Sequence, residues 1–189
     1  ALGGFEGRNI AAGDVLPTGR PGSFKAGAFV DEAARWQSAT PAVLRMVKGL
    51  YWHRLTEESG QQFLADEWKV APEADRMGYR FKGGQPLEFV EREQPFGAGS
   101  DPSNIVDGCY SYGSIQVPGG TEPIILHRDA VSGGGYFTLG AIISADMDFI
   151  GQLQPHTPVY FQVVSMEEAL AARQQRQTAL DEIRSSLAQ

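Results

Sequence analysis

Short apolar segments separated by glycine and proline are the feature that most restricts the fold of this chain. The sequence has 189 residues, of which 23 are glycine and 11 are proline. Many short strands bounded by such turn residues are typical of β-sandwiches and β-barrels. We therefore expect a mainly β protein with a few short helices.

Seven apolar runs are candidate strands: residues 43–47, 78–81, 87–90, 113–117, 123–126, 136–144 and 159–164. The runs 113–117 and 123–126 flank a Pro-Gly-Gly turn at 118–120, which predicts a hairpin. The runs 78–81 and 87–90 flank a Lys-Gly-Gly-Gln turn and are expected to pair in the same way.

Three helices are expected. Thr56 is a good N-cap, followed by two glutamates, for a helix that ends near Trp68. A short helix fits residues 146–153, and the capping box that begins at Ser165 starts a C-terminal helix to about residue 187. The apolar face of that last helix is thin, which favours a solvated helix, with docking on a partner as the alternative.

Composition narrows the classes of partner. The net charge is −7, which argues against nucleic acid or an anionic membrane as the main partner. The sequence contains no apolar run long enough to cross a bilayer and no secretory signal pattern. One cysteine, Cys109, cannot form a disulfide within the chain, so a reducing, cytoplasmic location is expected, with this residue in the core.

Residues 128–135 form the most polar part of the central stretch 105–147. Arg128 and Asp129 follow an apolar run, and Gly133, Gly134 and Gly135 leave the backbone bare for a ligand or another chain. Charged and hydroxyl groups at a strand end are where sites are often built. A mobile surface loop is the plainer interpretation.

Several kinds of chemistry lack their motifs. The sequence has no phosphate-binding loop for ATP, no dinucleotide fingerprint and no biotin attachment sequence around a lysine. His53, His127 and His156 are far apart, without the spacing of zinc ligands, and are interpreted as structural or surface residues. No metal site is predicted. Any ATP or biotin chemistry would come from other polypeptides.

Several ordered motifs resemble the allophanate hydrolase subunit 2 family. They are residues 113–117, 123–126 and 129–136, the Asp-Arg-Met-Gly-Tyr-Arg segment 75–80, and the Asp-Pro-Ser-Asn-Ile segment 101–105. The family includes the C subunit of 5-oxoprolinase and the carboxyltransferase region of urea carboxylase. The resemblance covers nearly the whole chain up to Glu168, and its motifs do not choose between these two branches.

The resemblance implies a cyclophilin-like β-barrel that is repeated in the full-length protein. Residues 1–41 would then be the tail of a truncated N-terminal subdomain, residues 42–165 the barrel, and residues 166–189 the C-terminal helix. Because family members are longer and the sequence begins at Ala1, we expect a fragment or processed product. Its expected partners are the N-terminal portion of the same protein, a partner subunit, or both.

The resemblance also assigns roles to site residues. Asp129 would orient or deprotonate an amide nitrogen, Ser132 would hydrogen-bond a carbonyl, and the glycine amides would stabilise an oxyanion. The alternative is that Asp129 only fastens its loop through backbone N–H groups. Arg76 either binds a carboxylate or pairs with an acid, whereas Arg80 is interpreted as structural. The full set of substrate-binding candidates is Arg76, Tyr112, Gln116, Gly133, Gly134, Gly135 and Tyr136.

Two classes of function follow. The first is a subunit of a biotin-dependent carboxyltransferase or an ATP-dependent amidohydrolase that acts on a small amide, urea or lactam. Carboxybiotin or ATP would be supplied by the partner subunit, because no cofactor is expected on this chain. The second is a non-catalytic binding or regulatory module. A pocket with convergent polar groups at residues 129–136 would favour the first, and a flat apolar surface would favour the second.

Overall fold

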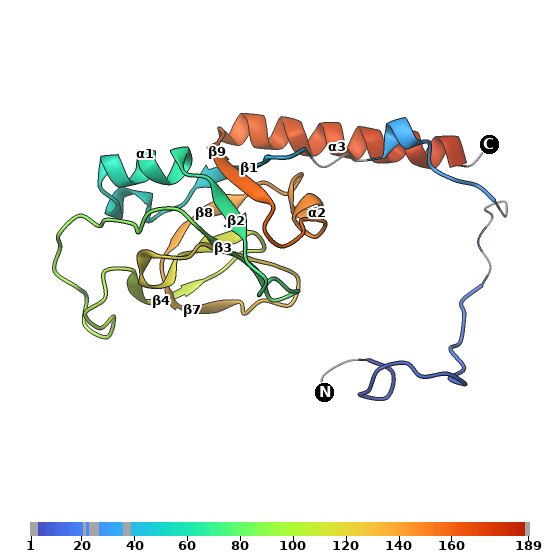
Figure 1. Ribbon diagram of the computed structural model, residues 1–189, viewed down its shortest axis with the longest axis horizontal. Coiled ribbons are helices and arrows are strands. Elements are labelled where there is room, and N and C mark those ends of the chain that lie inside the picture. The colour runs from blue at the N-terminus through green and yellow to red at the C-terminus, as the bar shows by residue number, and fades with distance from the viewer. Residues whose placement is uncertain (1–3, 21, 23–26, 36–38, 188–189) are drawn as a thin grey trace.

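A closed β-barrel is the centre of the computed structural model, which describes residues 4–20, 22, 27–35 and 39–187 (Figure 1). The strands follow the order β1-β8-β5-β6-β3-β2-β9 around the barrel. β1 pairs with β9 in parallel, and the other neighbours are antiparallel. The bounds are β1 (Ala42–Lys48), β2 (Trp68–Val70), β3 (Gly78–Lys82), β5 (Ser114–Gln116), β6 (Ile124–Leu126), β8 (Thr138–Ile142) and β9 (Pro158–Val163). The predicted barrel and the hairpin of β5 and β6 are confirmed.

The barrel interior is filled by side chains that alternate along the strands. Leu44 and Met46 of β1 are fully buried, whereas Val43, the residue before Leu44, is 47% exposed. This period of two is that of a strand with one face in the core. Aromatic rings close the end nearest α1 (Glu57–Ala65), where the Phe63 and Phe161 rings stack with centroids 4.8 Å apart. Burial of these side chains is the main stabilising term for the fold.

Helix α1 begins where the sequence predicts, since the Thr56 hydroxyl accepts a hydrogen bond from the Ser59 N–H at 3.1 Å. It ends at Ala65, three residues short of the predicted end. Trp68 instead opens β2, where it is fully buried and its indole N–H donates to the Phe63 carbonyl at 3.0 Å. Tertiary packing of this one ring therefore decides the helix boundary.

The other helices also follow their local signals. Helix α2 (Met147–Ile150) is shorter than predicted, and α3 (Met166–Leu187) spans the predicted length. The Ser165 hydroxyl accepts from the Glu168 N–H at 3.1 Å, and the Glu168 carboxylate accepts from the Ser165 N–H at 2.7 Å. The capping box is thus confirmed. Three short 3-10 turns complete the helices of the described residues: η1 (Glu32–Ala34), η2 (Trp52–Arg54) and η3 (Pro118–Gly120).

The predicted strand at residues 87–90 is wrong. β3 pairs with β2 and β6, and this segment contributes one isolated bridge, between Phe89 and Leu55. Its backbone N–H groups bond to other turns: Leu87 donates to the Gly120 carbonyl at 2.6 Å and Val90 to the Arg54 carbonyl at 2.8 Å. Because its backbone N–H groups donate to these carbonyls and not to a neighbouring strand, the segment covers the barrel end without joining the sheet.

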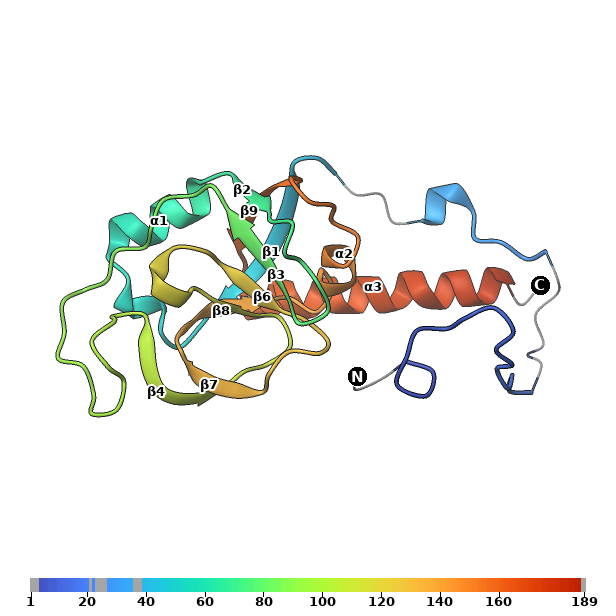
Figure 2. The same cartoon turned by 60° about the horizontal axis from the view of Figure 1, so that its bottom comes forward.

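The predicted glycine loop is also wrong, because Gly133–Tyr136 is strand β7, paired with β4 (Asn104–Cys109) outside the barrel (Figure 2). A side chain at Gly134 would lie 3.3 Å from the Tyr110 ring, so these glycines let β7 lie flat beside its neighbours. The Tyr110 hydroxyl accepts from the Tyr136 N–H at 2.8 Å and donates to its carbonyl at 2.9 Å. Cys109, predicted in the core, is exposed at the end of β4.

Outside the barrel, α3 projects from β9 with Ala172 as its one buried residue among those described. The described residues before β1 run away from the barrel as an open chain (Figure 1). In the part of the chain that the structure describes, no helix has the length and apolar character needed to cross a membrane.

Candidate functional site

Two loops meet at one end of the barrel, the turn at residues 75–78 that leads into β3 and the loop at 127–132 that follows β6. The Asp75 carboxylate accepts hydrogen bonds from the backbone N–H groups of Met77 at 2.8 Å and Gly78 at 3.3 Å, which closes the turn. The two loops are joined through their backbones, with His127 N–H donating to the Met77 carbonyl at 3.1 Å. The strand pairing of β3 with β6 therefore brings the two family-like motifs together.

Asp129 forms a two-pronged ion pair with Arg76. The guanidinium Nε and Nη2 each donate to one carboxylate oxygen at 2.7 Å, and the Asp129 N–H donates to the Arg76 carbonyl at 2.8 Å. The pair is open to solvent, with 72% of the Arg76 side chain and 50% of the Asp129 side chain exposed. Hydrogen bonding from Arg76 lowers the pKa of Asp129. Asp129 is therefore an ionised acceptor and a weak base while this pair is intact.

Asp129 does fasten its loop, but in a way the sequence did not predict. The sequence-based alternative is that its carboxylate accepts hydrogen bonds from backbone N–H groups. The observed bonds run to the Arg76 side chain, 53 residues away in sequence. Arg76 pairs with an acid, Asp129, in this structure. Arg80 pairs with Glu122 at 3.0 Å, as its structural interpretation expects.

A pocket of about 290 Å³ lies beside this pair. Two predicted site residues, Tyr112 and Ser132, line it. Asp129 does not, although its neighbours on both sides do. The complete lining is Tyr110, Ser111, Tyr112, Leu126, His127, Arg128, Ala130, Val131 and Ser132. The pocket combines aromatic walls with a hydroxyl, an imidazole and a guanidinium, which is the composition typical of small-molecule sites.

His127 is the site residue that sequence reasoning missed. Both of its ring nitrogens are buried and lack a hydrogen-bond partner among the described residues. Its ring lies between Tyr79, with centroids 5.6 Å apart, and Tyr112, with centroids 5.4 Å apart. Burial raises the pKa of the Tyr79 hydroxyl, and the nearby Asp75 raises it further. Its place in the sequence could have identified it, because His127 is the first residue after a buried strand and functional sites are often built at strand ends.

Arg128 is the second such residue, since its place at a strand end was noted in the sequence but no role was assigned to it. Its guanidinium lies over the Tyr112 ring, 4.5 Å from the centroid, and its Nη2 is 3.5 Å from the Asp148 carboxylate. Burial raises the pKa of the Tyr112 hydroxyl, which the positive Arg128 partly offsets. The pocket therefore has a fixed positive charge at its rim.

The remaining predicted residues lie elsewhere. Gln116 is buried in β5. Gly133, Gly134 and Gly135 belong to β7, and Tyr136 ends that strand with its side chain 45% exposed. Gly134 and Tyr136 lie beside Tyr110, and none of these five residues lines the pocket. Among the described residues, no cluster of three or more histidine, cysteine, aspartate or glutamate side chains could hold a metal ion.

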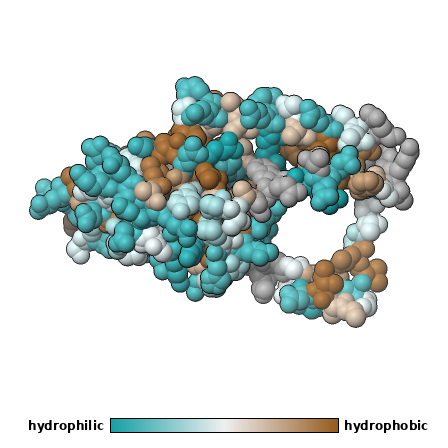
Figure 3. Space-filling view, turned by 45° about the horizontal axis from the view of Figure 1, so that its top comes forward, coloured by the Kyte–Doolittle hydropathy of each residue, from teal (hydrophilic) through white to brown (hydrophobic). Residues whose placement is uncertain are grey.

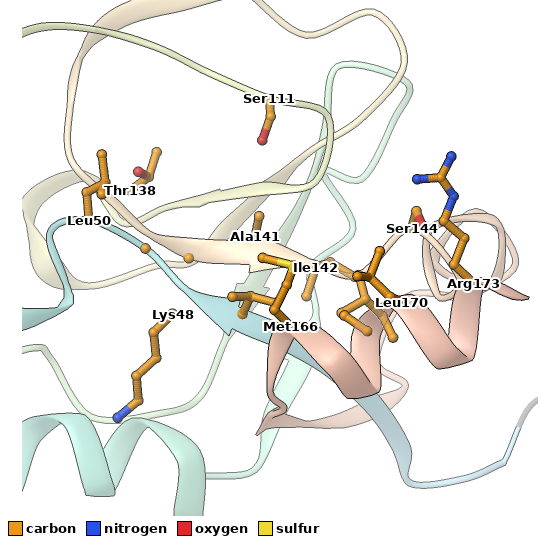
Figure 4. A pocket seen from close by; sticks show the side chains of 15 residues that line it. Lys48, Leu50, Ser111, Thr138, Ala141, Ile142, Ser144, Met166, Leu170 and Arg173 are labelled. Carbon is orange, nitrogen blue, oxygen red and sulfur yellow. The ribbon is translucent and has the colours of Figure 1, made fainter.

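A second hollow, of about 410 Å³, lies between the start of α3 and strands β1 and β8 (Figure 4). Leu50, Met166 and Leu170 line it and are 86%, 56% and 55% exposed. Figure 4 shows Met166 and Leu170 next to Ile142, with the Lys48 amine pointing away. Apolar surface gathers near the start of α3 on the face shown in Figure 3. This groove offers apolar contact, in contrast to the polar pocket beside Asp129.

Comparison with known proteins places this chain in a family. The family described as "Carboxyltransferase domain, subdomain A and B" matches residues 1–163. The chain is 31% identical over 183 residues to the 5-oxoprolinase C subunit of Haemophilus influenzae, covering 97% of this chain and 54% of that protein. It is 28% identical over 194 residues to urea amidolyase of Lachancea kluyveri, covering 95% of this chain and 10% of that one.

Solved structures agree with the sequence comparisons. The crystal structure of the K. lactis urea amidolyase superposes with a TM-score of 0.73 at 26% identity, over 82% of this chain and 9% of that one. The K. lactis urea carboxylase gives 0.71 at 28% identity, over 82% and 14%. The chain belongs to the carboxyltransferase domain family, subdomains A and B, which confirms the resemblance seen in the motifs. It spans about half the length of its relatives among the 5-oxoprolinase C subunits.

Proposed function

We propose that this chain is the pocket-bearing part of a biotin-dependent carboxyltransferase or an ATP-dependent amidohydrolase that acts on a small amide, urea or lactam. The observation that carries the proposal is the meeting of the two family motifs at one barrel end, where the Arg76–Asp129 pair adjoins a polar pocket. The names of its relatives, the C subunit of 5-oxoprolinase and urea amidolyase, support this class of substrate.

Asp129 is the proposed proton-handling residue. In carboxyl transfer the substrate nitrogen is the nucleophile, and amide, urea and lactam nitrogens are poor nucleophiles because their lone pairs are delocalised into the carbonyl. An ionised carboxylate that accepts the N–H hydrogen bond orients this nitrogen and receives its proton as the new bond forms. Arg76 holds the carboxylate ionised and in a fixed orientation. To act as a base, Asp129 exchanges part of its pairing with Arg76 for the substrate, which the exposure of the pair permits.

The cofactor chemistry belongs to the partner in this proposal. The sequence has neither a phosphate-binding loop nor a biotin attachment motif. Carboxybiotin would supply an activated carboxyl group, and ATP would supply activation of the carbonyl. The residues of this chain bind and orient the amide. A pull-down from the source cell, probed with a biotin-specific reagent and for ATP-dependent amide hydrolysis, distinguishes these two partners.

The replacement Asp129→Asn tests the catalytic role, because it keeps the shape and removes the base. In the complex reconstituted with its partner, we expect turnover to fall by about a hundredfold to ten-thousandfold. The fold should persist, as judged by circular dichroism. The matched control is Asp181→Asn, an exposed aspartate paired with Arg184 in α3, which should leave turnover unchanged. Near-normal turnover of Asp129→Asn disproves the catalytic role, and loss of the fold favours a purely fastening role.

One observation favours the alternative, a non-catalytic binding module, and it is the apolar groove beside α3. Leu50, Met166 and Leu170 are each more than half exposed there, and apolar side chains gathered in one groove are typical of a binding surface. Replacing Leu170 with Glu would abolish association with a partner that binds this groove. If Leu170→Glu abolishes the biological effect while Asp129→Asn does not, the binding module is the better description.

A further inference from the structure

Two arginine side chains converge on one backbone carbonyl at the start of β4. Arg54 of η2 donates from Nη1 to the Asn104 carbonyl oxygen at 3.2 Å, and Arg92 donates from Nη2 to the same oxygen at 3.4 Å. Both arginines are half-buried, and neither lines the pocket beside Asp129. The fold therefore holds two guanidinium groups from distant parts of the sequence next to each other, outside the site described above.

No acid offsets these two charges. Among the described residues neither guanidinium forms an ion pair, although Glu91 and Glu93 flank Arg92 in sequence. Burial lowers the pKa of Arg54, and the positive charge of Arg92 lowers it further. Because arginine stays protonated in proteins, the pair remains doubly positive. Seven other arginines in the described part of the chain do pair with a carboxylate: Arg8, Arg45, Arg76, Arg80, Arg128, Arg176 and Arg184.

Both guanidinium groups are held in place by their neighbours. The Arg54 group lies over the Tyr51 ring, 4.4 Å from its centroid. Arg92 Nη2 also donates to the Gln94 side-chain oxygen at 2.6 Å, and the Gln94 amide donates in turn to the Asp101 carbonyl at 2.7 Å. A guanidinium carries five N–H donors, and within the described chain acceptors are found only for Arg54 Nη1 and Arg92 Nη2. The remaining donors are available to an external acceptor, and the fixed side chains lower the entropic cost of binding it.

We propose that Arg54 and Arg92 together bind the phosphate group of a small molecule or free inorganic phosphate. A phosphate monoester carries a charge of about −1.5 to −2 at pH 7, which matches two guanidinium groups, whereas a carboxylate would leave one of them uncompensated. Its oxygens accept hydrogen bonds from both guanidinium forks at once. The chain has a net charge of −7, so the attraction for an anion is local to this pair. The inference goes beyond the proposed function and does not rest on it.

Titration of three probes into the 189-residue chain tests the proposal, with the ionic strength held constant so that screening is equal. The probes are inorganic phosphate, methyl phosphate and acetate. Calorimetry should show saturable binding of phosphate, with acetate bound about tenfold more weakly. Similar affinity for methyl phosphate shows that the site admits a phosphate ester, and binding of inorganic phosphate alone assigns the free ion; both outcomes support the proposal. Acetate binding as tight as that of phosphate, or no saturable binding of phosphate, overturns it.

Variants assign the binding to the two arginines. Arg54→Gln and Arg92→Gln should each weaken phosphate binding by about tenfold, because each removes one charge and one fork of donors. The matched control is Arg173→Gln, which should bind phosphate like the parent. Arg173 is exposed on α3 and also forms no ion pair among the described residues, but it shares no acceptor with a second arginine. Unchanged phosphate affinity in either Arg54→Gln or Arg92→Gln contradicts the shared site.

Two further measurements separate binding from a structural effect. Arg54→Lys and Arg92→Lys keep the charge and remove the planar fork, so phosphate should bind with an affinity between those of the parent and the glutamine variants. In the parent chain, the side-chain nitrogen chemical shifts of Arg54 and Arg92 should move when phosphate is added, while those of Arg173 should not. This last measurement needs no variant, so unmoved shifts of Arg54 and Arg92 overturn the proposal even if circular dichroism shows that a replacement disturbs the fold.

Discussion

Two arginine–aspartate pairs in this molecule have the same chemistry and different surroundings. Arg45 of β1 donates to Asp146, just before α2, with Nη2 to Oδ1 at 2.6 Å and Nε to Oδ2 at 3.1 Å. Arg76 donates to Asp129 with both bonds at 2.7 Å. The side chains of Asp146 and Arg45 are 4% and 36% exposed, whereas those of Asp129 and Arg76 are 50% and 72% exposed. Both pairs join segments that are distant in sequence, so the difference between them is burial.

Burial decides what each pair does. The Asp146 carboxylate also accepts from the Arg45 backbone N–H at 2.9 Å, so the same aspartate holds both the backbone and the side chain of β1. A buried carboxylate needs all of these bonds, because losing one partner leaves an uncompensated polar group. At the exposed pair, water or a ligand can replace either partner at little cost. The first pair therefore suits a structural link and the second suits a site that must change partners.

The largest expected effect comes from breaking the buried pair with Asp146→Ala. Arg45 would lose its side-chain partner, and its backbone N–H would lose its acceptor. We expect the free energy of unfolding to fall by about 3 kcal/mol, the lower end of the range for a broken buried pair because Arg45 can reach water. Urea denaturation measures this change. Asp181→Ala, at an exposed aspartate of α3, is the matched control and should leave the urea midpoint unchanged. A parental midpoint in Asp146→Ala would show that burial does not separate the two pairs.

A smaller effect is expected from Arg76→Gln, which breaks the exposed pair. The backbone bonds between the two loops remain, and both side chains become solvated. The urea midpoint should therefore stay close to that of the parent. A fall as large as that of Asp146→Ala would mean that the exposed pair is a structural link as well.

The smallest effect concerns titration. Arg76 lowers the pKa of Asp129 below its ordinary value of about 3.9. The pair therefore contributes its stability above that ordinary value, and this contribution is lost as the pH falls through the lowered pKa of the folded protein. Carbon NMR of the Asp129 carboxyl group should show its pKa rising towards the ordinary value in Arg76→Gln. An unchanged pKa would disprove the electrostatic coupling.

Much of the fold could be predicted because its signals are local. Thr56 and Ser165 cap helices through atoms three residues away, and the Pro-Gly-Gly turn at 118–120 places β5 beside β6. Interactions over so few residues depend little on the rest of the chain. The barrel was predicted from the same short apolar runs, and the family from motifs that are contiguous in sequence.

The site could be predicted only in part. Asp129, Arg76 and Ser132 were singled out, and the structure brings them to one barrel end. His127 and Arg128 were passed over because an isolated histidine or arginine has no pattern around it. Their meaning depends on Tyr79, Tyr112 and Asp148, which other strands and loops contribute.

Local sequence signals were enough to predict where helices and turns begin, that the chain is mainly β, and to which family it belongs. The tertiary structure alone decided the pairing of Gly133–Tyr136 with β4, the exposure of Cys109 and the lining of the pocket. The physical reason is the range of the interactions. A cap or a turn is satisfied by neighbours in the chain, whereas a strand pair, a buried ring or a pocket requires partners that only the closed barrel brings together.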